Sequence, residues 1–86
     1  MQSYIVTFRA EGSIKNALAE KVIKSSPCWC HLMGAHWLIK TDLSATQIRD
    51  KISPLVGING RVTVVAVQRN AALRNISQGD FVQRNL

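Results

Sequence analysis

The residues of this chain best suited to chemistry gather in one stretch, residues 27–43. It contains both cysteines, both histidines and both tryptophans. Cys28, Cys30 and His31, with His36 nearby, carry the thiol and imidazole groups that proteins use as metal ligands or as acids and bases. This stretch therefore contains the first candidates for a metal site or a catalytic centre.

The same stretch predicts a hairpin, because two β-like runs, residues 28–32 and 36–40, flank a break at residues 34–35. With a connection of two or four residues, Leu32 lies opposite Trp37, and cross-strand partners share a face. A connection of three residues would reverse this alignment. The expected helix-facing residues are Cys28, Cys30, Leu32, Trp37 and Ile39, and the expected residues of the opposite face are Trp29, His31, Leu38 and Lys40.

Face alternation argues against a metal site. The two cysteines point to one face of the strand and His31 to the other, so they do not converge on a tetrahedral ion. The spacing also differs from the usual C-x-x-C form. We therefore predict no metal site and no bridge between Cys28 and Cys30, which are interpreted as small buried hydrophobic residues.

Catalytic candidates are few. His31 and His36 could act as acid and base without a metal, although histidines satisfied within an interface are the more common case. No phosphate-binding glycine loop or zinc-protease motif occurs. The carboxylates are dispersed along the chain, as Glu11, Glu20, Asp42, Asp50 and Asp80, and no two of them suggest a shared metal ion.

The elements that must position these residues follow the order β-α-β-β-α-β. Residues 4–9 predict the first strand, residues 14–25 a helix with Ser13 as its N-cap, and residues 61–67 the last strand. The second helix begins at the capping-box sequence Ser44-Ala45-Thr46-Gln47 and contains Pro54 near its end.

This order predicts an α+β, ferredoxin-like domain over residues 1–68, with a four-stranded antiparallel sheet and two helices on one face. Residues 69–86 form a C-terminal tail, predicted to be partly helical or to pack on a partner subunit. The first and last strands are apolar on both faces, which is typical of strands covered on both sides. We therefore expect a second subunit or the tail on the face without helices.

The composition favours anionic partners. The net charge is +6 and the isoelectric point is near 10.0, with basic residues scattered along the chain. Such an excess on a small domain suits nucleic acid, an acidic protein or another polyanion. No apolar run is long enough to span a membrane and the start of the chain lacks the features of a signal peptide, so we expect a cytoplasmic protein.

Three segments resemble one known family. The strand Y-I-V-T-F at residues 4–8, W-x-H at residues 29–31, and H-W-L-I-K-T-D-L-S-A-x-Q-I-R-D-K at residues 36–51 are similar to the SinR-like branch of the Cas-two-like superfamily. This superfamily includes the small CRISPR spacer-acquisition subunit and the VapD-type ribonuclease toxins. The likeness covers about residues 4–67 and contains no catalytic signature.

The resemblance implies a ferredoxin-like homodimer that binds DNA or RNA. Nucleases of the family hold a divalent metal with an Asp at the end of the first strand, and Arg9 occupies that position here. A cation does not replace an anionic Mg²⁺ ligand, and Glu11 is the nearest substitute. The resemblance therefore favours binding without metal-dependent cleavage, and Mg²⁺ is expected only in a residual nuclease.

Three functions remain in competition. The first is a homodimer that binds the nucleic-acid backbone and has no cofactor. The second is a residual nuclease that uses Glu11 with a metal, or His31 and His36 without one. The third is an adaptor or regulator of a protein partner such as a toxin or antitoxin. The predicted phosphate contacts are Arg9, Lys15, Arg49, Lys51 and Arg61, and the predicted dimer contacts are Phe8, Trp29, His31 and Leu38.

Overall fold

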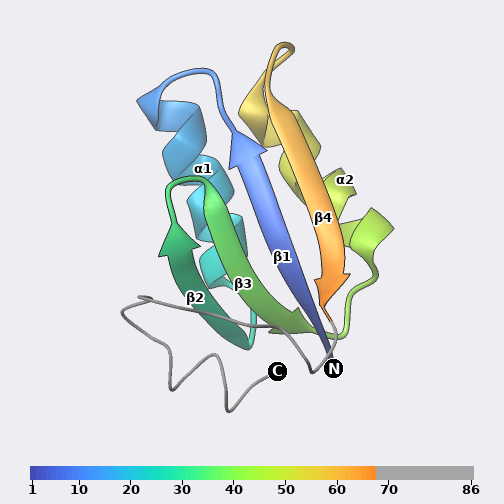
Figure 1. The fold of residues 1–86 in the computed structure, drawn as a ribbon. Helices are drawn as coiled ribbons and strands as arrows, with labels where there is room; N and C mark the ends of the chain where they lie inside the picture. The colour runs from blue at the N-terminus through green and yellow to red at the C-terminus, as the bar shows by residue number, and fades with distance from the viewer. Residues whose placement is uncertain (68–86) are drawn as a thin grey trace.

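The computed structural model of the protein describes residues 1–67 and confirms the predicted order of elements (Figure 1). The prediction for residues 69–86 lies outside the described residues. The strands are β1 (Gln2–Arg9), β2 (Cys28–Met33), β3 (His36–Thr41) and β4 (Arg61–Val67), and the helices are α1 (Ser13–Lys24) and α2 (Ala45–Val56).

The strands form one antiparallel sheet in the order β2-β3-β1-β4, so β1 is central and β2 and β4 are the edges. Both helices cover the same face of this sheet (Figure 1). This is the ferredoxin-like α+β arrangement that the sequence predicts. We call the side without helices the open face; on it Ile5 of β1 lies between Leu38 of β3 and Val65 of β4.

The main core lies between the sheet and the two helices. Alternate residues of β1 point into it, and Ile23 of α1 and Ile52 of α2 are almost completely buried there. Burying an aliphatic side chain of this size contributes about 1.5–3 kcal/mol. The buried members of this core are Tyr4, Val6, Phe8, Ala19, Ile23, Trp37, Ile39, Ile48, Ile52 and Val56.

The start of α2 confirms the predicted capping box. The Ser44 hydroxyl accepts the Gln47 backbone N–H at 3.2 Å, and the Gln47 side-chain oxygen accepts the Ser44 backbone N–H at 2.8 Å. The helix continues through Pro54 to Val56.

The predicted N-cap of α1 is wrong by one residue. Ser13 is the first helical residue, and Gly12 takes the cap position with φ of 97° and no side-chain hydrogen bond. The Gly12 carbonyl instead accepts the Asn16 backbone N–H at 3.0 Å. A glycine adopts this positive φ without strain, so the backbone turns into the helix one residue earlier than a serine cap would require.

The predicted faces of the hairpin are right for β3 and wrong for β2. The connection has two residues, because Met33 pairs with His36, but His31 rather than Leu32 lies opposite Trp37. Leu32 is the extra residue of a β-bulge, and a bulge reverses the alternation of the residues before it. Trp29 and His31 therefore face the helix side, while Cys30 and Leu32 pack on the open face with Leu38.

No helix within residues 1–67 has the length and apolar character needed to cross a membrane.

Candidate functional site

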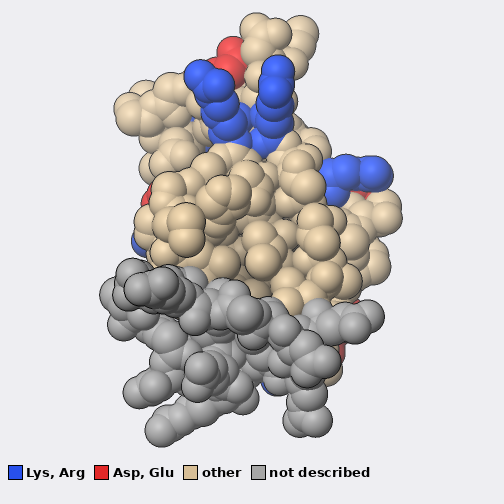
Figure 2. Space-filling model, in the orientation of Figure 1, with Lys and Arg blue, Asp and Glu red and all other residues tan. Residues whose placement is uncertain are grey.

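Two arginines meet at one end of the open face. Arg9 is the last residue of β1, Arg61 is the first of β4, and the two are direct cross-strand partners. Both are exposed. Because Tyr4, Val6 and Phe8 point into the core, strand alternation directs Arg9 to the open face. Figure 2 shows basic side chains standing together at this end, above an uncharged surface.

Like charges placed opposite each other on a sheet destabilise it unless an anion lies between them. Within residues 1–67, neither Arg9 nor Arg61 forms an ion pair. A phosphate group could accept hydrogen bonds from both guanidinium groups, since the planar guanidinium matches the geometry of phosphate oxygens. The arginine pair is therefore a suitable site for an anionic oxygen ligand.

The other predicted phosphate contacts lie elsewhere. Lys15 is in the first turn of α1, and Arg49 of α2 forms an ion pair with Asp50 at 3.1 Å. Lys51 lies on α2, in the helix layer, beside a cavity described below. The structure thus brings together only Arg9 and Arg61 of the five predicted residues.

Glu11 is engaged with the loop between α2 and β4. Its carboxylate accepts the backbone N–H of Asn59, and its own backbone N–H donates to the Val56 carbonyl at 2.9 Å. Gly57 lies against the same carboxylate, where a Cβ atom would collide with it. These contacts connect the end of β1 to the start of β4, so Glu11 helps to position the arginine pair.

The two histidines are not brought together. His31 lies on the helix side, stacks on Trp37 at 4.3 Å between ring centroids, and donates from Nε2 to the Gly34 carbonyl at 2.8 Å. His36 lies on the open face, with Nδ1 2.8 Å from the Thr7 hydroxyl. Both rings hold the hairpin in place, and the structure provides no shared site for them.

Trp29 belongs to an aromatic cluster beside α1. Its ring centroid is 6.0 Å from that of Trp37, and the Lys24 ammonium lies 5.5 Å from the Trp29 centroid and 5.7 Å from the Trp37 centroid. A cation above an aromatic face is attracted by the ring's electron density. The cluster therefore attaches the edge strand β2 to the end of α1.

The open face differs in composition from the predicted dimer surface. Leu38 lies on it, but Phe8 is buried in the core, and Trp29 and His31 face the helix side. The bulge at Leu32 explains why Trp29 and His31 lie on the helix side. Strand alternation explains why Phe8 points into the core with Tyr4 and Val6. The apolar residues that do lie on the open face include Ile5, Cys30, Leu32, Leu38, Val65 and Val67.

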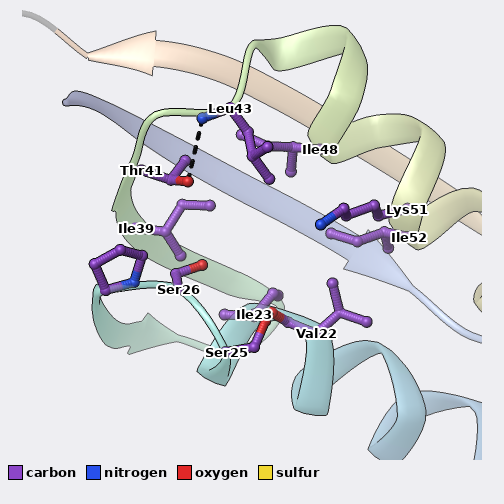
Figure 3. Close-up of a pocket in the computed structure, with 11 residues that line it drawn as sticks. Val22, Ile23, Ser25, Ser26, Ile39, Thr41, Leu43, Ile48, Lys51 and Ile52 are labelled. Carbon is purple, nitrogen blue, oxygen red and sulfur yellow. Dashed lines mark hydrogen bonds between the residues drawn. The ribbon is translucent and has the colours of Figure 1, made fainter.

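The sequence gives no sign of a cavity of about 230 Å³ in the helix layer. It forms where the end of α1, the end of β3 and the middle of α2 meet (Figure 3). Apolar periodicity predicts only that its isoleucines are buried in the core. Nothing in the sequence predicts that Ser26 and Thr41 lie near Lys51. Contacts between these distant segments create the site.

No three His, Cys, Asp or Glu side chains within residues 1–67 are grouped so that they could hold a metal ion. No protein-family model, curated protein or solved structure matches the chain.

Proposed function

We propose that the protein is a Cas-two-like, cytoplasmic homodimer that binds the phosphate backbone of DNA or RNA and lacks the metal-dependent nuclease activity of its family. The observation that carries this proposal is the arginine pair, Arg9 and Arg61, on the open face. The overall charge of +6 supports it, since long-range attraction brings polyanions to a basic protein.

The position of Arg9 supports binding over cleavage. The resemblance places the metal-binding Asp of the nucleases at the end of the first strand, where this protein has Arg9. The nearest carboxylate in sequence, Glu11, accepts a hydrogen bond from the Asn59 backbone N–H. A guanidinium group in place of a carboxylate repels a divalent cation and attracts a phosphate.

The open face supports the dimer. Val65 of the edge strand β4 is 53% exposed and lies next to Ile5 of the central strand β1. A second subunit packed on these apolar residues would remove them from water, which is the main source of stability in a homodimer. Two arginine pairs in one dimer would give a nucleic acid two phosphate sites.

Fluorescence anisotropy with labelled single- and double-stranded DNA and RNA tests the proposal. We expect binding that weakens steeply with salt and depends little on sequence. The double variant Arg9→Ala/Arg61→Ala should flatten the dependence of log affinity on log salt by roughly one unit for each arginine that contacts a phosphate. The matched control is Lys51→Ala, which removes a positive charge from the helix layer.

Two results would overturn the proposal. Flat anisotropy with all four nucleic acids at low salt would exclude backbone binding. Cleavage of the same labelled strands in Mg²⁺ or Mn²⁺, lost in Glu11→Gln, would show that a nuclease activity remains.

A further inference from the structure

The cavity in the helix layer lies on the other side of the sheet from the arginine pair. Its floor is apolar and consists of four isoleucines, each at most 4% exposed. Its remaining lining includes the turn after α1 and the end of β3. The floor residues are Ile23, Ile39, Ile48 and Ile52.

Among the residues that the structure describes, the lining of this cavity includes polar groups and a single charge. The Lys51 ammonium and the Ser26 hydroxyl point toward the same space from opposite sides (Figure 3). Within residues 1–67, no lining residue carries a carboxylate and Lys51 forms no ion pair. The cavity therefore has a positive charge at its rim that no described lining residue neutralises.

Hydrogen-bond donors accompany the charge. The Thr41 hydroxyl oxygen accepts the Leu43 backbone N–H at 3.3 Å, so its own proton remains available to an acceptor. Thr41 is only 5% exposed, which protects such a hydrogen bond from competition with bulk water. Ser26 is a further donor, whereas the Ser25 hydroxyl already donates to the Val22 carbonyl.

We propose that this cavity binds a small amphiphilic monocarboxylate, with one aromatic ring or a short alkyl chain as its apolar part. The carboxylate would accept hydrogen bonds from Lys51, Thr41 and Ser26, while the apolar part lies against the isoleucines. Its volume of about 230 Å³ lies between the ~150 Å³ of a cavity that binds benzene and the ~300 Å³ at the lower end of drug-sized pockets. One ring with a short acidic arm matches that space.

The chemistry excludes more polar ligands. A sugar or a nucleotide has hydroxyl groups all round, and burying them on four isoleucines would leave them without hydrogen-bond partners. A ligand with two negative charges would meet one cation, Lys51, among the described lining residues. The proposal is independent of nucleic-acid binding, because it uses the opposite side of the sheet.

Titration of the ¹⁵N-labelled protein with phenylacetate, followed by NMR, tests the proposal, with phenylacetamide as the uncharged probe of the same shape. We expect phenylacetate to shift the backbone amide signals of Ser26, Thr41 and Leu43, and to bind about tenfold more tightly than phenylacetamide, a difference of about 1.4 kcal/mol. Added salt should reduce this preference for the charged probe, because Lys51 is exposed.

Lys51→Ala should lower the affinity for phenylacetate to that for phenylacetamide, and Lys51→Glu should remove phenylacetate binding. The matched control Lys15→Ala changes a lysine of the other helix and should leave the affinity unchanged. The NMR spectrum of each variant reports directly that it is folded. Equal affinity for the two probes, no shift at these amides, or unchanged binding by Lys51→Ala would overturn the proposal.

Discussion

Glu11 shows how a single side chain holds two distant segments together. Its carboxylate accepts the Asn59 backbone N–H in the loop between α2 and β4. We expect Glu11→Ala to lower the free energy of unfolding by about 1 kcal/mol, because the backbone amide of Asn59 loses its acceptor. Glu11→Gln keeps an acceptor oxygen and should cost less than half as much. Urea denaturation followed by circular dichroism measures both.

Equal losses of stability in Glu11→Gln and Glu11→Ala would show that the negative charge, and not the hydrogen bond, is what matters. No loss in either variant would contradict a structural role for Glu11.

The two thiols of β2 should differ in reactivity. Cys30 is fully buried, and this burial raises the pKa of its thiol because the charged thiolate is disfavoured away from water. Cys28 is only half-buried. Since the thiolate is the reactive form, iodoacetamide should modify Cys28 first and Cys30 more slowly at every pH up to the usual thiol pKa.

Mass spectrometry of the folded protein measures the two rates, with Cys28→Ser isolating the reaction of Cys30. In urea, the Cys30 rate should rise to that of an exposed thiol. Equal rates in the folded protein would contradict the burial of Cys30.

At the scale of the element, α2 depends on its capping box. Ser44→Ala removes the acceptor of the Gln47 backbone N–H and should destabilise the protein by about 1 kcal/mol. Ser44→Asp retains an acceptor and should keep most of the stability. Thermal unfolding followed by circular dichroism measures the difference, and equal midpoints for Ser44→Ala and the unmodified protein would contradict the role of the cap.

At the scale of the whole molecule, the open face should hold the dimer together. Val65→Glu places a charge on the exposed apolar part of this face, on the edge strand β4, and should convert a dimer into monomers at micromolar concentration, because an unpaired carboxylate is costly to bury. Sedimentation velocity measures the change. The control Ile58→Glu alters a residue that is 94% exposed in the α2–β4 turn and should leave the dimer intact.

A monomeric unmodified protein, or a Val65→Glu variant that remains dimeric, would contradict the dimer. In either case the open face would have another role.

The sequence by itself determined the order of the helices and strands, the faces shared by residues of β1, β3 and β4, and the start of α2. Alternation in residues 4–8 and 62–66 correctly grouped the residues of each strand by face, but it did not identify the core side, since Phe8 was predicted as a dimer contact and lies in the core. The Ser44 to Gln47 capping box correctly marked the start of α2. These features depend on residues within a few positions of one another, so local spacing is sufficient to predict them.

Only the tertiary structure determined which residues lie together on each face of the hairpin, at the arginine pair and in the cavity. One bulged residue, Leu32, moved Trp29 and His31 to the helix side, because adding a residue to a strand reverses every side chain before it. The meeting of Arg9 with Arg61, and the cavity beside Lys51, join segments far apart in the chain. Such contacts depend on strand register and helix packing, which the spacing of nearby residues does not predict.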